Sequence, residues 1–291
     1  MRVFVIAKCL TQLAHRDRIA ELITAQSDPI PIFSEHDLIC GRKIEMRCLI
    51  ISDIHANLSA LEAVLADVKR KNTAYDIVWC LGDVVGYGPD PNECIDLLRT
   101  LPHICLAGNH DWAVLGKLDL ETFHENAAYV VRWTQDHLSQ DNLTYLKARP
   151  SELEQGDYRL VHASPREPIW EYITDVNVAE DNFGLMHEPY CLVGHTHVPI
   201  LFIKDARKNV RATYPNFGVP ITLKQNQRYI INPGSVGQPR DGDPRAAYAI
   251  LDTATPTWTP YRVDYNIKTT QDKMRALKIP GRLVDRLEYG R

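Results

Sequence analysis

The sequence has seven cysteines but no Cys-x-x-Cys pair. Structural thiolate metal sites are usually built from such pairs, so a cysteine-based metal site is not expected. Cys48, Cys80, Cys105 and Cys191 each fall inside a short apolar run that is typical of a strand. Cysteines in such positions are usually buried and reduced, as in proteins of a reducing compartment. We therefore expect a cytoplasmic protein.

The sequence also lacks a long hydrophobic run and an excess of basic residues. No apolar segment approaches the ~18 residues that a membrane-spanning helix needs, and the apolar stretch after Met1 is interrupted at Lys8, too early for a signal peptide. The formal net charge is −4, whereas general nucleic-acid and membrane binders usually carry a basic field. An anionic substrate is still allowed, because bound metal ions can reverse the sign of the charge locally.

Residues 1–45 differ in pattern from the rest of the 291-residue chain. A partial apolar face predicts a helix from Thr11 to Gln26, which the proline-containing segment 27–31 ends. We find no recognisable chemistry in this part. From Met46 a stronger pattern begins, with an apolar run that ends at Asp53. We therefore predict an N-terminal extension over residues 1–45 and a domain over residues 46–291.

Strands and helices alternate after Met46, and strands dominate beyond about residue 150. Helices are predicted for Asn57–Lys71, from Asp90 onward, and for Glu125–Leu138, Thr270–Leu277 and Arg282–Tyr289. Further strands are predicted for Asp76–Leu81, His103–Ala107, Tyr158–His162, Tyr190–Val193, Pro199–Ile203, Arg228–Ile231, Ala246–Leu251 and Trp258–Val263. The spacing of Asp90, Pro91 and Glu93 predicts a capping box. The order predicts an α/β domain with two packed sheets and outer helices.

Five polar clusters each follow an apolar run that is predicted to be a strand. They are Asp53-Ile-His55, Gly82-Asp83, Gly108-Asn-His-Asp111, His162 and Gly194-His-Thr-His197. In open α/β sheets, ligands bind at the carboxyl ends of strands, where the loops converge. Each cluster alone is weak, since a Gly-Asp pair is usually a turn and Asn109 is a good helix cap. Five clusters, all at strand ends, favour one shared site.

The side chains of these clusters suit a divalent metal of intermediate softness. Carboxylate, amide and imidazole ligands together favour Mn, Fe, Co, Ni or Zn, whereas Mg and Ca prefer an all-oxygen set. Two such ions bring more positive charge than Asp53 and Asp83 return, so the site attracts a phosphate ester. The pKa of a bound water falls to roughly 7–9, which makes a metal-bound hydroxide available at neutral pH. Two ions ~3.5–4 Å apart can stabilise the attacking and leaving oxygens together.

These motifs resemble those of the calcineurin-like metallophosphoesterases. The resemblance covers about residues 46–263 and includes all five clusters. It is strongest to the small bacterial and archaeal phosphodiesterase branch, on the segments Gly82–Pro89, His162–Arg166 and Asn232–Arg240. The resemblance implies a four-layer α/β sandwich, in which two packed mixed β-sheets are flanked by helices. It also implies a hydrolase that cleaves phosphodiester or phosphomonoester bonds with two divalent ions, which we expect to be Mn²⁺.

The resemblance also implies a role for each residue of the motifs. One ion would be held by Asp53, His55 and His197 and the other by Asn109, His162 and His195, with Asp83 between them. His110 would protonate the leaving oxygen or stabilise the phosphoryl oxygens. Asp111 would orient the His110 ring, as outer carboxylates orient imidazoles.

The family normally begins a few residues before its first metal motif. Because 45 residues precede Met46 here, we expect Met46 to be the true start and residues 1–45 to be a misassigned extension. The alternative is a real N-terminal arm.

Some residues outside the five clusters are candidates for binding substrate. The loop Asn232–Arg245 is rich in turn residues, so its backbone N–H groups can face an anion, and Arg240 and Arg245 can reach a phosphate. The alternative is a surface loop in which these arginines pair with Asp241 and Asp243. Tyr87, in a glycine-flanked loop, is a further candidate. We expect the aromatic residues Trp133, Trp170 and Trp258 to be core or packing residues instead.

Other functions remain open at this stage. The same site could belong to a phosphoprotein phosphatase or a dinucleotide hydrolase, because no large insertion separates the motifs and an open site suits either. A non-catalytic interaction scaffold is disfavoured, since it has no need to keep the full ligand set and His110. The sequence is compatible with a homo-oligomer and does not decide the oligomeric state.

Overall fold

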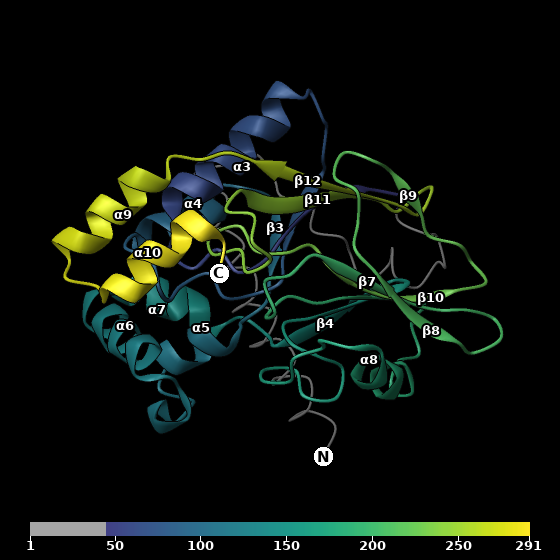
Figure 1. Ribbon diagram of the computed structural model, residues 1–291, viewed down its shortest axis with the longest axis horizontal. Helices are drawn as coiled ribbons and strands as arrows, with labels where there is room; N and C mark the ends of the chain where they lie inside the picture. The colour runs from purple at the N-terminus through teal and green to yellow at the C-terminus, as the bar shows by residue number, and fades with distance from the viewer. Residues whose placement is uncertain (1–44) are drawn as a thin grey trace, which may run out of the picture. The chain divides into compact units, whose positions relative to one another are not determined.

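The apolar runs of the sequence pair into two six-stranded sheets (Figure 1). The structure is a computed structural model that describes residues 45–291, so the helix predicted at Thr11–Gln26 lies outside the described residues. The first sheet has the order β3-β2-β1-β11-β12-β9 and the second the order β4-β5-β6-β10-β7-β8. The strands of the first sheet are β1 (Arg47–Ile51), β2 (Ile77–Cys80), β3 (His103–Cys105), β9 (Ile221–Thr222), β11 (Ala246–Asp252) and β12 (Thr257–Val263). Those of the second are β4 (Glu152–Gln155), β5 (Tyr158–Val161), β6 (Tyr190–Leu192), β7 (Ile200–Lys204), β8 (Val210–Thr213) and β10 (Arg228–Asn232).

Each sheet contains three neighbouring parallel strands. In the first sheet β1 pairs in parallel with β2, and β2 with β3. In the second sheet β5 pairs in parallel with β6, and β6 with β10. The remaining pairs are antiparallel, so both sheets are mixed. Parallel neighbours end at the same sheet edge, which brings together the loops that follow them.

The two sheets pack face to face through large apolar side chains. Cys48 and Ile50 of β1 face this inner layer, whereas Leu49 and Ile51, which alternate with them, face the helices. A strand that is buried on both faces needs a continuous apolar run, and β1 has one. The second sheet packs its outer face against α8 (Val176–Phe183). The predicted four-layer α/β sandwich is confirmed.

The other helices of the described residues pack mainly on the first sheet and on one another. They are α3 (Leu58–Arg70), α4 (Pro91–Arg99), α5 (Asn109–Val114), α6 (Glu125–His137), α7 (Gln140–Lys147), α9 (Ile267–Ala276) and α10 (Gly281–Tyr289), with a 3-10 turn η1 (Leu120–Thr122). The apolar faces of α9 and α10 close around Val130 of α6. The helices predicted within residues 45–291 are all present within a few residues of their expected bounds.

The predicted capping box at α4 is wrong. Asp90 does occupy the position before the helix, but its side chain caps no backbone N–H. It accepts a hydrogen bond from Nζ of Lys273 in α9 instead, at 2.7 Å. A long-range ion pair therefore replaces the expected local one and ties the C-terminal helices to α4.

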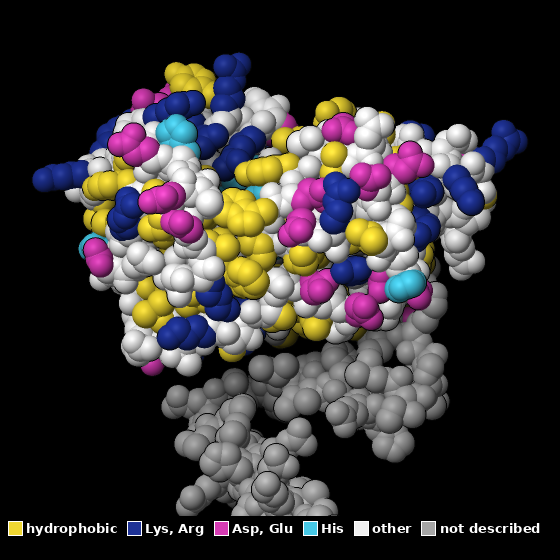
Figure 2. All heavy atoms as spheres, turned by 90° about the horizontal axis from the view of Figure 1, so that it is seen from below, with side chains coloured by type: hydrophobic (Ala, Val, Ile, Leu, Met, Phe, Trp, Pro, Cys, Tyr) yellow, Lys and Arg dark blue, Asp and Glu magenta, His cyan; other side chains and the backbone are white. Residues whose placement is uncertain are grey.

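The surface carries mixed charge. Lys and Arg side chains are interspersed with Asp and Glu over the face in Figure 2, and no continuous field of one sign covers it. The longest helices among residues 45–291 have 13 residues, and none is long and apolar enough to cross a membrane.

Candidate metal centre

The predicted ligands all lie in loops at the carboxyl ends of the two parallel strand triplets. Asp53 and His55 follow β1, Asp83 follows β2, and Asn109 opens α5 just after β3. In the second sheet His162 follows β5, and His195 and His197 follow β6. The parallel pairing places these strand ends at one edge in each sheet, and the packing of the sheets brings the two edges together. All these side chains are buried.

The side chains form two groups that share Asp83. One contains Asp53, His55, Asp83 and His197, and the other Asp83, His162 and His195, with the candidate ligand atoms of each group within 4.8 Å of one another. The amide oxygen of Asn109 lies 3.1 Å from Nε2 of His162 and so joins the second group. Each group is large enough to hold one divalent ion.

The histidine rings are held by backbone carbonyl oxygens. Nδ1 of His55, His162 and His197 lies 3.2, 2.8 and 2.6 Å from the carbonyl oxygens of Val85, Leu81 and Gln238. His195 is turned the other way, with its Nε2 3.1 Å from the carbonyl oxygen of Trp170. A carbonyl can only accept, so each ring in its neutral form keeps its hydrogen on that side and presents a lone pair to the site. This is the arrangement that outer groups impose on metal-binding imidazoles.

The two carboxylates have free oxygens that point to a cation. Oδ2 of Asp53 and Oδ2 of Asp83 are buried and have no hydrogen-bond partner. Such orphaned polar atoms are costly unless an unseen ion or water satisfies them. Burial raises the pKa of Asp53 to about 7, because nearby positive charge does not offset the loss of water. The donor set and the free oxygens together fit divalent metal ions.

The four ligand histidines differ in the direction of their pKa shifts. Burial lowers the pKa of His195 to about 3 and that of His55 and His197 well below the usual range. Burial acts on His162 too, but the carboxylate of Asp83, 3.5 Å from its Nε2, outweighs it and raises the pKa of His162 to about 9. Neutral imidazoles are the metal-binding form, so burial prepares three of these four rings for that role.

Much of the backbone of this site adopts the left-handed conformation. Ten described residues other than glycine have positive φ, and seven of them lie here: Asp53, His55, Ala56, Asp83, Tyr87, His195 and His197. Such residues each cost roughly 1–3 kcal/mol and persist where the surroundings impose them. The cost is lowest for Asp, Asn and His, which enter this region more readily than other types.

Two glycines leave room for the side chains of Asp83 and His110. A Cβ at Gly108 would lie 2.1 Å from Oδ1 of Asp83, and one at Gly86 would lie 2.5 Å from Nδ1 of His110. Gly86 also has φ of +93°, which other residues avoid. Glycine at positions 108 and 86 is therefore explained by the close approach of Asp83 and His110, respectively.

The prediction that Asp111 orients His110 is wrong. The Asp111 carboxylate accepts hydrogen bonds from the backbone N–H groups of Gly108, Val84 and Val85, at 2.9, 3.3 and 3.1 Å. These donors belong to the loops that carry Asp83 and Asn109, so Asp111 fixes the loops and not the ring. Nδ1 of His110 is buried without a hydrogen-bond partner, and burial lowers the pKa of His110 to about 4.

The loop Asn232–Arg245 also differs from expectation, because its N–H groups do not face an anion. Val236 and Gly237 donate to the backbone oxygens of Ser52 and Asp53, so this part of the loop supports the first ligand motif. Arg245 is exposed, pairs with Asp243 at 2.6 Å and does not line the pocket over the ligands. The alternative, an arginine–aspartate pair on the surface, is correct for Arg245.

Arg240, by contrast, lies in a pocket of about 240 Å³ over the ligands. The pocket is lined by Asp83, Tyr87, Asn109, His110, Thr122, Phe123, His124, Ala127, Trp170, Tyr172, His195, His197 and Arg240. The Arg240 guanidinium is 5.7 Å from the centre of the Tyr87 ring, and its Nε is buried without a hydrogen-bond partner. The ring of Tyr87 contacts those of His55 and His110, with centroids 4.7 and 4.3 Å apart.

The aromatic residues at the rim of this pocket were not expected there. Trp258 is buried in the core, as predicted, and Trp133 is half-buried and stacked on His137. Trp170 is half-buried at the pocket rim, where it packs against Phe123 and does not enter the core. Tyr172, which is 46% exposed, stacks on His195 with centroids 3.9 Å apart. A pair of aromatics soon after the His162 motif was the only sequence signal for this rim.

Comparison with known proteins identifies relatives of this chain. The family model described as the calcineurin-like phosphoesterase superfamily domain matches residues 46–256. An uncharacterized protein of Methanocaldococcus jannaschii is 39% identical over 247 residues, which are 83% of this chain and 97% of that protein. The crystal structure of a metallophosphoesterase from Sphaerobacter thermophilus has a TM-score of 0.77 at 47% identity, covering 85% of this chain and 100% of that one. A symmetrical bis(5′-nucleosyl)-tetraphosphatase of Aeromonas salmonicida is 28% identical over 144 residues, 47% of this chain and 50% of that protein.

Proposed function

Because the chain belongs to the calcineurin-like phosphoesterase superfamily and is a metallophosphoesterase, we propose that it hydrolyses phosphate esters at two divalent ions held by the two ligand groups. Asp53, His55 and His197 would hold one ion, and Asn109, His162 and His195 the other. Asp83 belongs to both groups and would lie between the ions. The observation that carries this proposal is the pair of groups sharing one buried carboxylate.

The chemistry follows from this arrangement. When bound, the two ions supply a hydroxide nucleophile at neutral pH and positive charge for the phosphoryl oxygens. Arg240 binds a phosphoryl oxygen through its guanidinium group, of which Nη2 donates to Gln238 and Nε has no hydrogen-bond partner in the protein. His110 donates a hydrogen bond from its ring to the phosphoryl or leaving oxygen, and Tyr87 holds that ring in place. The carbonyl partners of the four histidines keep the ligand atoms aimed at the site, so little has to move during the reaction.

The bond that is cleaved can belong to a diester or a monoester. A second candidate, a dinucleotide hydrolase, draws support from the aromatic rim, because Trp170 and Tyr172 offer ring faces to a nucleobase. A phosphoprotein phosphatase would use the same ligands. A scaffold is disfavoured because every ligand and His110 are retained in one buried cluster.

Manganese is our proposed native metal, since mixed oxygen and imidazole donors suit Mn²⁺, with Fe, Co, Ni or Zn as alternatives. The five described free cysteines are all buried, which agrees with a proposed cytoplasmic location. Oligomeric state does not enter this proposal, because the described residues of one chain complete both ligand groups.

A metal-by-substrate screen tests the proposal. Purified full-length protein is assayed with bis-p-nitrophenyl phosphate and p-nitrophenyl phosphate, each with Mn²⁺, Ni²⁺, Co²⁺, Zn²⁺ and Mg²⁺. We expect hydrolysis of at least one ester, fastest with Mn²⁺. Asp83→Asn should lose both activity and bound metal, whereas Asp205→Asn, at a partly exposed position between β7 and β8, should change neither. Protein with full metal content and no hydrolysis of either ester would refute the proposal.

A further inference from the structure

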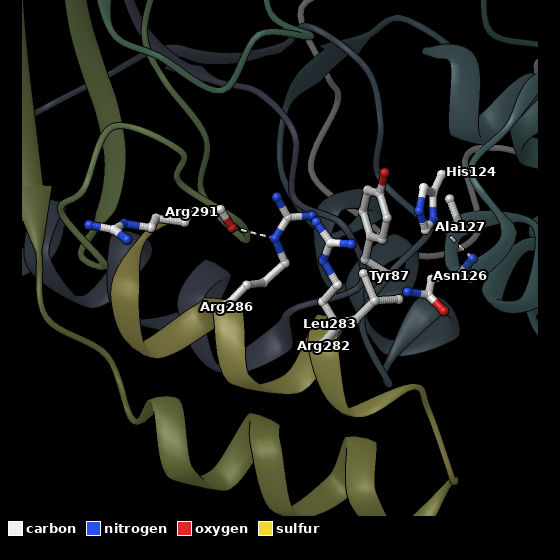
Figure 3. Close-up of a pocket in the computed structure, with 8 residues that line it drawn as sticks. All are labelled: Tyr87, His124, Asn126, Ala127, Arg282, Leu283, Arg286 and Arg291. Atoms are coloured by element: carbon white, nitrogen blue, oxygen red, sulfur yellow. Dashed lines mark hydrogen bonds between the residues drawn. The ribbon is translucent and has the colours of Figure 1, made fainter.

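A second pocket, of about 260 Å³, lies beside the one over the ligands (Figure 3). Tyr87, His124 and Ala127 line both pockets, so the two are adjacent. The far side of the second pocket is formed by Arg282, Leu283 and Arg286 of α10, together with Arg291. Figure 3 shows the guanidinium groups of Arg282 and Arg286 directed toward the side of the pocket where Tyr87 lies.

The arginines that face these pockets lack acidic partners. Within residues 45–291, no carboxylate forms an ion pair with Arg240, Arg282 or Arg286, although other arginines such as Arg245 and Arg262 do pair. Burial and the nearby charges of Arg240 and Arg282 lower the pKa of Arg286 to about 10. These three arginines repel one another and meet no side-chain carboxylate, and the main-chain oxygen of the last residue, Arg291, contacts only Arg286. The cluster therefore produces a local positive field that attracts an anion.

A purely structural role accounts for only part of this cluster. Nε of Arg286 donates to the main-chain oxygen of Arg291 and so helps to end α10. The terminal nitrogens of Arg286 make no hydrogen bond to the described residues, and neither does Arg282. Planar guanidinium groups with free terminal nitrogens are suited to two-point contact with a phosphate.

We propose that the pocket of Arg282 and Arg286 binds a second phosphate group of the substrate, while the scissile phosphate lies at the metal centre. This inference rests on the proposed function and narrows it: the substrate class is phosphate esters that carry another phosphate, such as nucleoside polyphosphates. Arg240 and Tyr87 lie between the two positions and would contact the connecting part of the substrate. The whole protein has a net charge of −4, so the attraction for such a polyanionic substrate comes from the local positive charge of these arginines.

Binding of two uncleavable analogues tests the inference on the metal-loaded, full-length protein. α,β-Methylene-ADP has two phosphorus groups joined by a carbon bridge, and adenosine 5′-methylenephosphonate has one. Isothermal titration calorimetry gives Kd for each. In Arg282→Gln/Arg286→Gln we expect Kd for the two-phosphorus analogue to rise by about tenfold or more, since two charge-assisted contacts are lost. Kd for the one-phosphorus analogue should rise by less than about threefold. Arg132→Gln, which removes an exposed arginine of α6 outside both pockets, should change neither value.

Two results would overturn the inference. Unchanged binding of α,β-methylene-ADP would show that the arginines do not hold a phosphate, and an equal loss for both analogues would show a general charge effect. If the double variant does not fold, as judged by its melting curve, Arg282→Lys and Arg286→Lys are measured instead. Each keeps the charge but loses the planar contact, so each should raise the ratio of Kd for the two-phosphorus analogue to Kd for the one-phosphorus analogue. Failure of the proposed function is recognised separately, because wild-type protein would then hydrolyse no nitrophenyl ester with any metal.

Discussion

At the scale of single residues, His110 is the buried histidine of the site that no backbone carbonyl holds. Its Nδ1 has no hydrogen-bond partner, and its ring packs between those of His55, Tyr87 and Phe123. We predict that His110→Ala retains bound metal but lowers kcat by ~10²–10⁴, the usual contribution of a positioned acid or hydrogen-bond donor. Elemental analysis alongside kcat checks both parts.

The comparison with Asp83→Asn makes that result interpretable. Asp83→Asn removes the charge shared by both ligand groups and should cost metal as well as rate. If His110→Ala loses as much metal as Asp83→Asn does, His110 is a ligand and its assignment here is wrong. Esters with good leaving groups should be less affected than others if His110 acts as an acid, whereas a uniform loss indicates stabilisation of the phosphoryl oxygens.

Asp111 has a structural role that a substitution should reveal. Its carboxylate satisfies three backbone N–H groups in the loops around Asp83, and each unsatisfied buried donor costs about 1–3 kcal/mol. We predict that Asp111→Ala lowers the free energy of unfolding by about 3 kcal/mol or more. Asp119→Ala, which removes an exposed carboxylate that caps η1, serves as the control and should cost about 1 kcal/mol at most. Urea denaturation of both variants gives the comparison; similar small losses would contradict this role.

The ligands could be predicted from the sequence because few residue types bind metals and strand ends are visible as the ends of apolar runs. The partners of Asp111 and Arg245 could not. Asp111 was expected to reach the adjacent ring, but the three N–H groups that it contacts became available only when the loops after β2 and β3 met. Arg245 was within reach of both a substrate and Asp243 in sequence terms, and the fold turned it to Asp243.

At the scale of elements, the long apolar strands and the amphipathic helices were predictable, and the short polar elements were not. β4 has the sequence Glu-Leu-Glu-Gln and is an edge strand with no fully buried residue. α8 spans eight residues, of which Ala179, Asn182 and Phe183 are buried. Neither carries enough periodic hydrophobicity to be distinguished from a loop. β4 is held by pairing with β5, and α8 by packing against the second sheet.

One contact between elements offers a stability test that depends on pH. Tyr248 of β11 donates a hydrogen bond to the buried carboxylate of Asp67 in α3, at 2.6 Å. Although burial opposes ionisation, hydrogen bonds from Lys71, Tyr248 and Arg70 outweigh it and hold the pKa of Asp67 below its usual value. We predict that Asp67→Asn lowers the free energy of unfolding by about 1.5–3 kcal/mol at pH 7, as expected for hydrogen bonds to a charged group.

The sign of the pH dependence follows from the direction of this shift. A carboxylate whose pKa is lowered on folding stabilises the protein fully above its unfolded pKa of about 4 and loses that effect as the pH falls through its folded value. The difference between wild type and Asp67→Asn should therefore stay constant from about pH 7 to pH 5 and narrow below about pH 4. Asp136→Asn, at an exposed position of α6 that forms no ion pair or side-chain hydrogen bond with the described residues, is the matched control. A gap that already closes near neutral pH would exclude ionised Asp67 as its source.

At the scale of the whole molecule, residues 45–291 contain both sheets and every predicted ligand. Met46 itself is tied to Thr253 by backbone and side-chain hydrogen bonds, so the domain is anchored from that residue onward. We predict that a protein starting at Met46 folds with a melting temperature and a specific activity close to those of the full chain. Thermal melts and the ester assay check this, and insoluble truncated protein would show that residues 1–45 are needed to complete the core.

The position of the two α10 arginines near the metal centre could be found only from the complete fold. Arg282 and Arg286 lie in a short C-terminal helix with no motif, far in sequence from the ligand clusters. They reach the neighbourhood of Tyr87 because the apolar residues of α9 and α10 pack on α6. No local pattern encodes that packing partner, so the sequence predicted only that these residues lie in a helix.

The left-handed backbone of the ligand loops limits how this site can change by mutation. Asp53, His55, Asp83, His195 and His197 must both offer a metal-binding atom and tolerate positive φ. Only Asp, Asn and His satisfy both demands well, because Glu and Cys bind metals but enter this backbone region less readily. Attempts to engineer a thiolate or glutamate site here should therefore fail through misfolded loops before metal affinity is tested. Exchanges among Asp, Asn and His remain open, so variation at this centre should tune its charge more easily than it alters the class of metal bound.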